Sequence, residues 1–198
     1  MSLLRDLIVY AGVLVLLSAC TAAPATRLYL LRPVEAAPLE KSTPAGRHPQ
    51  IVIRDVRLPA YLDRPQIVTR GKSDRLVINE YAHWGSHLRD EMARVLAENL
   101  SSLLAGSQVM VAPVHRHVRQ DVRIDLEVIH FERQVDGPVR LSARWWIDGG
   151  EDRGPHTADV TLSATPAADS DEALVASMSS VYGELAQAMA ISIRQAAR

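Results

Sequence analysis

Two histidines are the side chains whose spacing comes nearest to a metal site. His83 and His87 lie four residues apart, which on a helix would place both imidazoles on one face. A zinc site needs at least three protein ligands, and no cysteine or suitably spaced third histidine accompanies this pair. His115 and His117 alternate in a polar stretch after Pro113, which favours a solvated loop. The sequence therefore predicts no metal site.

Possible nucleophiles and phosphate-binding groups lack the neighbours that their chemistry requires. The serine pairs at 101–102 and 179–180 fall within helical patterns, without a Gly-x-Ser-x-Gly turn. The Gly-Lys-Ser run at 71–73 lacks the upstream glycine of a phosphate-binding loop. Glu151 and Asp152 lie in a glycine-rich turn, where solvated carboxylates are expected rather than an acid–base pair. The prediction is a protein that is not an enzyme and needs no cofactor.

The charge pattern argues against a nucleic-acid partner. The formal net charge is −1, so the chain has no overall attraction for phosphate backbones. Arg116, Arg119 and Arg123 are clustered but lack the interleaved aromatic side chains of a single-strand binder. We expect no nucleic acid among the partners.

The only cysteine closes the most apolar stretch of the chain. Residues 7–17 carry no charge, which matches the length of a signal-peptide core and is too short to span a bilayer. They end in Leu17-Ser18-Ala19-Cys20, which looks like the leucine–small–small–cysteine lipobox of bacterial lipoproteins. The alternative is an ordinary apolar helix with an incidental cysteine. The prediction is lipidation at Cys20 by a thioether-linked lipid with acyl chains such as palmitate.

Processing at this cysteine sets the predicted organisation of the chain. Residues 1–19 would be a lipoprotein signal peptide, 20–27 a lipidated tether and 28–198 a single periplasmic domain. Thr21 follows the cysteine where an aspartate commonly retains such proteins in the inner membrane. The predicted location is therefore the outer membrane, lipid-anchored and facing the periplasm.

The elements that must position these side chains follow from hydrophobic periodicity. Short apolar or alternating runs predict strands, including a hairpin at 66–84 and an antiparallel meander from 122 to 164, with a bulge near 129–131. Apolar residues at spacings of three and four predict two helices. The first stripe is Leu88, Met92, Val95, Leu96, Leu100 and Leu103, with Ser86 as N-cap; the second is Leu174, Met178, Val181, Leu185, Ala188 and Ile191, capped by Asp169 or Ser170.

This order of elements defines the predicted fold class. It is α+β, with a mostly antiparallel or mixed sheet and two long helices packed on one face. With one cysteine, no internal disulfide is available, so packing alone must hold the domain together.

Two features predict a subunit or partner contact. Pro59 and Pro65 bracket a stiff bend, and stiff backbone loses little entropy on docking. Adjacent tryptophans on one strand face opposite ways, so one is expected in the core and the other at an interface or under another part of the chain. The residues expected at the contact are Tyr61, Leu62, Arg64, Ile67, Trp145 and Trp146. The alternative is that Tyr61 and Leu62 tuck under the edge of the sheet.

The stretch at 58–70, together with the lipobox, resembles the PqiC-like family of ABC-type transport auxiliary lipoproteins. The resemblance extends over most of residues 20–195. Its motifs here are Tyr29-Leu30-Leu31, the Leu-Pro-x-Tyr-Leu-Asp-Arg-Pro-Gln-Ile-Val run at 58–68, "RVLAENL" at 94–100, and strands at 122–132 and 141–145. One departure is the segment at 83–88, where the family often has a Trp-Ala-Glu-Pro-Leu type sequence.

The resemblance implies a non-catalytic accessory role in lipid transport between the two membranes. The implied partner is an MCE-domain protein of the same transport system, with the lipoprotein holding the outer-membrane end. A protein that caps a bridging ring is itself expected to be a homo-oligomeric ring, since closure leaves no heterologous face unpaired. The alternative function is a structural cell-envelope lipoprotein without a transport role.

Lipidation is tested by replacing Cys20 with Ser. The variant lacks the thiol that carries the lipid, so we expect it to leave the outer-membrane fraction. Immunoblots of fractionated cells measure this shift. Retention of the variant in the outer membrane at the wild-type level would contradict the anchor.

Overall fold

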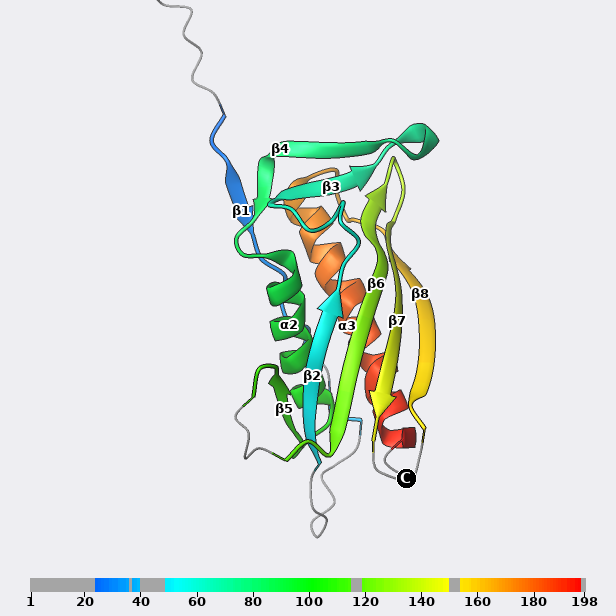
Figure 1. Cartoon of the computed structure of the whole chain (residues 1–198). Helices are drawn as coiled ribbons and strands as arrows, with labels where there is room; N and C mark the ends of the chain where they lie inside the picture. Colours follow the sequence, from blue (N-terminus) through cyan, green and yellow to red (C-terminus); the bar gives the residue numbers. More distant parts are fainter. Residues whose placement is uncertain (1–23, 36, 40–48, 115–118, 150–153, 197–198) are drawn as a thin grey trace, which may run out of the picture.

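The structure is a computed structural model that describes residues 24–35, 37–39, 49–114, 119–149 and 154–196. Within them lie eight strands, one short 3-10 helix and two long α-helices (Figure 1). Their bounds are β1 Arg27–Tyr29, β2 Gln50–Arg57, β3 Gln66–Arg70, η1 Lys72–Asp74, β4 Leu76–Trp84, α2 Leu88–Leu103, β5 Gln108–Val111, β6 Val122–Gln134, β7 Val139–Asp148, β8 His156–Ala164 and α3 Asp171–Ala196. The predicted hairpin and meander are confirmed as β3–β4 and β6–β7–β8.

Strand β6 organises the sheet because it pairs with three strands. Its first half pairs in parallel with β2, and its last residues pair in parallel with β3. Its other edge pairs with β7 in antiparallel fashion along nearly its whole length. Strand β5 extends the sheet beyond β2, β8 extends it beyond β7, and β4 and β1 extend it beyond β3. The predicted mixed sheet is therefore confirmed.

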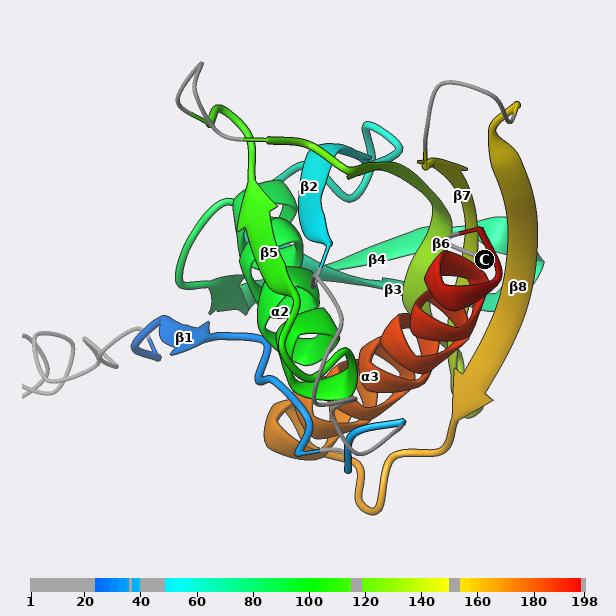
Figure 2. The same cartoon turned by 90° about the horizontal axis from the view of Figure 1, so that it is seen from below.

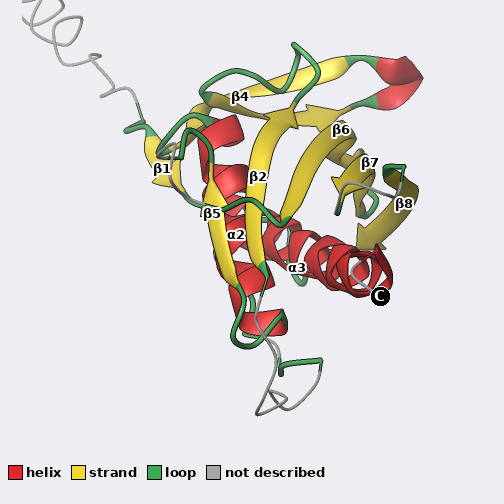
Figure 3. Ribbon diagram, turned by 60° about the horizontal axis from the view of Figure 1, so that its bottom comes forward, coloured by secondary structure: helices red, strands yellow, loops and turns green. Residues whose placement is uncertain are grey.

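The two faces of the sheet differ in polarity because side chains alternate along each strand. In β6, Val122, Ile124, Leu126 and Val128 are all buried and face the helices, as predicted. The opposite face carries charges that pair across strands, such as Arg54 with Asp125 and Arg123 with Asp148. One face thus builds the core and the other faces solvent (Figure 3).

Both helices pack on the apolar face, as predicted. Helix α2 contacts β2 and β5, whereas α3 contacts β6, β7 and β8, and the helices also contact each other (Figure 2). Every residue of the predicted α2 stripe is buried. The Tyr182 hydroxyl donates to the Met92 carbonyl at 2.8 Å, joining the helices, and burial raises the pKa of this phenol above its ordinary value. None of the described helices has the length and apolarity needed to cross a bilayer.

Helix details differ from the prediction at two places. Helix α2 has His87 as its N-cap residue rather than Ser86, whose hydroxyl instead donates to Glu91 Oε2 at 3.0 Å. The buried stripe of α3 continues after Leu185 through Met189 and Ile193, and the predicted Ala188 is partly buried against the core. The predicted Ile191 instead lies outside the stripe and is 49% exposed.

The start of α3 agrees with the prediction. Ser170 Oγ accepts a hydrogen bond from the Ala173 amide at 3.2 Å, which satisfies one of the free amides of the first turn. The bulge predicted near 129–131 is also confirmed, because the register of β6 against β7 shifts between Val128 and His130.

Residues 27–35, the N-terminal strap, lie across both helices. Leu31 is 1% exposed and belongs to the core. Within α3, Gly183 gives the strap room, because a Cβ placed there would lie 2.7 Å from Val34 Cγ2. Such a contact is closer than real side chains allow, so the strap depends on this glycine.

We predict that Gly183→Ala destabilises the protein although alanine favours helices. Overpacking costs about 1–3 kcal/mol, which opposes a gain in helix propensity of about 1 kcal/mol. We expect a net loss of about 1 kcal/mol in the free energy of unfolding, measured by urea denaturation. Gln187→Ala, on the exposed face of the same helix, is the control and should change stability by less than about 0.5 kcal/mol. A Gly183→Ala protein as stable as wild type would refute the close contact.

Candidate functional site

The proline-bracketed bend carries the chain from one partner of β6 to the next. Strand β2 leaves β6 at the pair Arg57–Glu127, and β3 joins β6 at the pair Thr69–Arg133. Residues 58–65 connect the two, turning through a bond from the Leu62 amide to the Pro59 carbonyl at 2.9 Å. The most distinctive stretch of the sequence therefore carries the chain from β2 to β3 along the same edge of β6.

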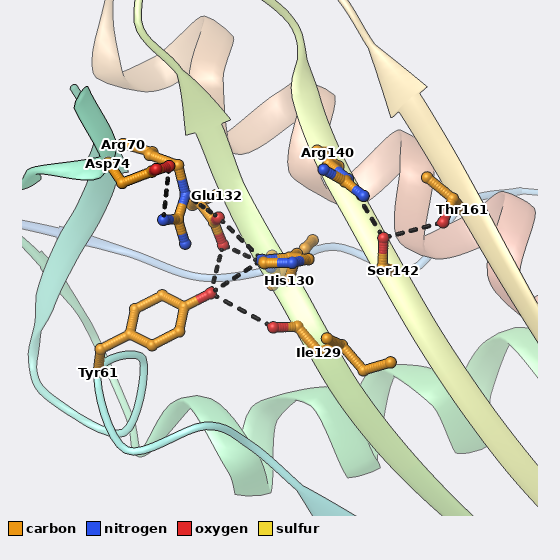
Figure 4. A network of polar contacts seen from close by, with 10 residues as sticks. Tyr61, Arg70, Asp74, Ile129, His130, Glu132, Arg140, Ser142 and Thr161 are labelled. Atoms are coloured by element: carbon orange, nitrogen blue, oxygen red, sulfur yellow. Dashed lines mark hydrogen bonds and ion pairs between the residues drawn. The ribbon is translucent and has the colours of Figure 1, made fainter. Parts of the chain in front are cut away.

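A fully buried carboxylate holds this bend against β6 (Figure 4). Glu132 Oε2 accepts from the Tyr61 hydroxyl at 2.8 Å and from the Phe131 amide at 2.9 Å. Glu132 Oε1 accepts from Arg70 Nε at 2.9 Å, and His130 Nδ1 lies 3.3 Å away. The bend, β3 and β6 each supply a member of this network, so it joins all three.

Electrostatics keep the Tyr61 phenol and the Arg70 guanidinium of this network protonated. Burial, and then the hydrogen bond to Glu132, raise the pKa of Tyr61 well above its ordinary value, so the phenol remains a donor. The hydrogen bond to Glu132 raises the pKa of Arg70, whose guanidinium also lies 5.7 Å from the Tyr61 ring centroid. A buried charge with a partner and several donors is tolerated, whereas an unpaired one is not. The arrangement is that of a structural clamp, and no proton transfer is needed for it.

The bend itself buries Glu132 on the face of β6 that lies opposite to the helices. Ile129 is the extra residue of the bulge and is 41% exposed. After it, Phe131 faces the helices, where its ring lies 5.9 Å from the Tyr182 ring, so the adjacent Glu132 points to the other face. The network was missed at the sequence level because alternation does not show that a distant segment covers part of the outer face.

The six residues expected at a contact have different surroundings in the chain. Leu62, Ile67 and Trp145 are 3%, 1% and 2% exposed and belong to the core. Tyr61, Arg64 and Trp146 are half-buried and keep some surface. Four of the six lie in or beside the bend, and the contact itself stays a prediction.

The two tryptophans lie on opposite faces of β7, as predicted. Trp145 packs into the core, whereas Trp146 lies on the charged outer face. The guanidinium of Arg57, the last residue of β2, lies 5.3 Å from the Trp146 ring centroid. This contact brings the outer face of β7 close to the start of the bend.

Residues singled out for chemistry are scattered in the structure. His83 lies in β4 and His87 caps α2, so the pair does not share a helical face. Across the part of the chain that the structure describes, no group of three or more metal-ligating side chains is found. Cys20, His115, Arg116, His117, Glu151 and Asp152 lie outside the described residues.

Two helix side chains hold the N-terminal strap by its backbone. Ser179 Oγ accepts from the Arg32 amide at 3.1 Å, and Asn99 Oδ1 accepts from the Val34 amide at 2.8 Å. Both residues are buried polar positions in helices. A buried asparagine on the apolar side of a helix is a signal that sequence reasoning could have used.

The strap forms one wall of a groove against α3. The groove has a volume of about 920 Å³, and its lining includes Leu28, Leu30 and Val34 of the strap and Val175, Ala176 and Ser180 of α3. Strand β1 is fixed beside it by parallel pairing with β4 and by a bond from the Gly85 amide to the Tyr29 carbonyl at 2.8 Å. The groove between the strap and α3, which lies next to the predicted tether in the sequence, thus has a largely apolar lining.

Comparisons with known proteins were made for the whole chain. A family model described as an ABC-type transport auxiliary lipoprotein component matches residues 29–190. No curated protein matches the sequence significantly. The crystal structure of an uncharacterized protein aligns with a TM-score of 0.71 at 21% identity, covering 85% of this chain and 99% of the other.

Two further solved structures are more distant. A Xanthomonas campestris protein of the DUF330 family aligns with a TM-score of 0.63 at 14% identity, over 88% of this chain and 96% of that one. A PelC dodecamer from Paraburkholderia phytofirmans aligns with a TM-score of only 0.44 at 10% identity, over 74% of this chain and 92% of that one. The uncharacterized protein and the DUF330 protein share the fold of this chain.

We predict that Tyr61→Phe lowers the free energy of unfolding by about 1–3 kcal/mol, because it deprives the buried Glu132 carboxylate of one donor. Urea denaturation of the purified protein measures the change. Tyr81→Phe is the matched control, since Tyr81 is 44% exposed and should tolerate the change. Equal stability of the two variants would show that the Tyr61 hydroxyl does not hold the bend.

Proposed function

The chain belongs to the family of ABC-type transport auxiliary lipoprotein components, and from this premise we propose that it is the outer-membrane-anchored, periplasm-facing accessory subunit of an MCE/ABC-type lipid transport system. The family match over residues 29–190 carries the proposal. The Leu17-Ser18-Ala19-Cys20 signature supports the anchor. In this role the protein maintains membrane integrity without catalysing a reaction.

The arrangement of the N-terminus supports anchoring. The strap begins at Arg27, seven residues after Cys20, and is tied to both helices by Ser179 and Asn99. A short tether followed by a firmly packed segment would keep the domain close to the membrane that holds the lipid. Two or more acyl chains make such anchoring stable.

A role in assembly rather than catalysis agrees with the polar contacts of the domain. The most buried charge, Glu132, is bonded within the fold by Tyr61 and Arg70. Its contacts stiffen the bend whose outer residues include Asp63 and Pro65, both exposed. A stiff projecting segment suits a partner surface because little entropy is lost on docking.

The proposed contact uses the surface that the bend and β7 leave open. Arg64 and Trp146 provide a charged and an aromatic group on this surface. Beneath it, three core residues pack against the rest of the domain and fix the backbone that carries the surface: Leu62, Ile67 and Trp145. Tryptophan and arginine are enriched at the energetic centres of interfaces. This surface would serve either as the contact between subunits of a homo-oligomeric ring or as the contact with the MCE-domain protein.

We predict that the wild-type protein co-purifies with an MCE-domain protein and that Trp146→Ala weakens this association or the ring by at least about tenfold. Affinity purification and mass measurement in solution report the two assemblies. Ile191→Ala is the control, because Ile191 is 49% exposed and belongs to α3, which packs on the face of the sheet opposite to Trp146.

Thermal melts separate assembly from folding, since Trp146 is only half-buried and its loss should leave the melting temperature nearly unchanged. A wild-type protein that stays monomeric both alone and with its partner would refute the ring. Purification without any MCE-domain protein would favour the structural cell-envelope role.

A further inference from the structure

Two leucines next to the predicted tether are the most exposed large apolar side chains in the described part of the chain. Leu28 is 69% exposed and Leu30 is 51% exposed. They flank Tyr29, whose hydroxyl donates to Glu172 Oε1 at 2.8 Å. Because side chains alternate along an extended segment, the two leucines share one face of the strap, and both border the groove against α3.

The backbone that carries the leucines is held in place. Strand β1 pairs with β4 from Arg27 to Tyr29, and the Arg32 amide is bonded to Ser179 Oγ. Leu31, between the exposed leucines and the rest of the strap, is buried in the core. A mobile terminus often exposes apolar residues, but here a fixed strand presents them together, which marks an interaction surface.

The length of the tether indicates what this surface meets. Leu28 is eight residues from Cys20, and an extended chain spans at most about 3.6 Å per residue, so the two lie within about 29 Å of each other. If Cys20 carries the lipid, as the proposed function holds, a membrane surface is within reach of β1. A lipid on Cys20 would itself bring the bilayer close to β1, whereas nothing in this geometry requires a partner protein there.

Charges beside the strap do not oppose contact with a membrane. Asp171 is paired with Arg27 at 2.7 Å and accepts from Asn79 at 3.0 Å. Glu172 accepts a hydrogen bond from the Tyr29 hydroxyl. The hydrogen bond from its own backbone amide, and after it the bond from Tyr29, lowers the pKa of the Glu172 carboxyl below its ordinary value. Each carboxylate that contacts β1 is therefore partnered within the protein.

We propose that Leu28 and Leu30 dock onto the phospholipid bilayer, so that the domain is oriented on the membrane by β1 as well as held by its lipid. The inference rests on the lipid anchor of the proposed function. Leucine side chains partition into the boundary between headgroups and acyl chains, and two on one rigid face act together. The sheet and helices then project from the membrane in one defined orientation.

The full lipidated protein provides the test, since lipidation consumes the only native thiol. A bimane fluorophore is attached through Leu28→Cys, or through Ile191→Cys as control, and each protein is placed in vesicles of phosphatidylethanolamine and phosphatidylglycerol. Ile191 lies nineteen residues beyond Glu172 in α3, about 28 Å along the helix. We expect lipids with a nitroxide near the headgroup to quench the label at 28 strongly and the label at 191 weakly.

A second substitution tests whether the leucines cause the docking. Leu30→Ser, added to the protein labelled at 28, should lower the ratio of docked to undocked domain by about tenfold, seen as loss of nitroxide quenching. Leu30 is half exposed, so the melting temperature should stay unchanged. Val111→Ser, at another exposed apolar residue, should leave the quenching as it was.

The possible results are distinct. Equal nitroxide quenching at 28 and 191 overturns the inference, as does quenching that survives Leu30→Ser. Protection of the label at 28 from both nitroxide lipids and aqueous iodide also overturns it, because a second copy or a protein partner then covers the leucines. Failure of the protein to float with vesicles refutes the anchor and the inference with it, whereas flotation without quenching refutes the inference alone.

Discussion

The sharing of β6 between two parallel partners is the constraint on which the rest of the fold depends. A strand of 13 residues offers more backbone groups than β2 can pair, and β3 takes those that β2 leaves. The chain must therefore leave the sheet and return to it further along the same strand. The bend at 58–65 makes this step, and Glu132 holds it by bonding Tyr61 and Arg70. Separating the bend or β3 from β6 would leave the buried Glu132 carboxylate without a partner, which is strongly unfavourable. The network therefore fixes the relative positions of the bend, β3 and β6.

A second set of contacts fixes the N-terminal strap to the helices. The strap crosses α2 and α3 and is bonded to Asn99 and Ser179, while Gly183 leaves room for Val34. Leu31 of the strap is buried, so the strap is part of the packed domain. If Cys20 carries a lipid, as proposed, a pull on that lipid would be transmitted through the strap to the helices. For an accessory subunit of a transport system, a rigid connection between the strap and the domain would fix the position of the partner-binding surface relative to the N-terminus.

Local patterns predicted much of this architecture, and long-range contacts account for what they missed. The alternation in β6 and β7 gave their buried faces, and the slip near Ile129 indicated the bulge. The position of β3 beside β6 was not predictable, since it depends on pairing between residues more than sixty positions apart. The burial of Glu132 under the bend and the roles of Asn99 and Ser179 also depend on partners more than sixty positions away in sequence. Lipidation at Cys20 rests on local sequence alone and stays a prediction.

We propose that this protein acts in the same transport system as an MCE-domain protein. Epistasis measures this most directly: cells lacking the lipoprotein, the MCE-domain protein or both are compared for outer-membrane permeability to detergent. We predict that the double deletion is no more permeable than the stronger single deletion, because both proteins would serve one route. Additive permeability in the double deletion would contradict it and assign the lipoprotein a separate role in the envelope.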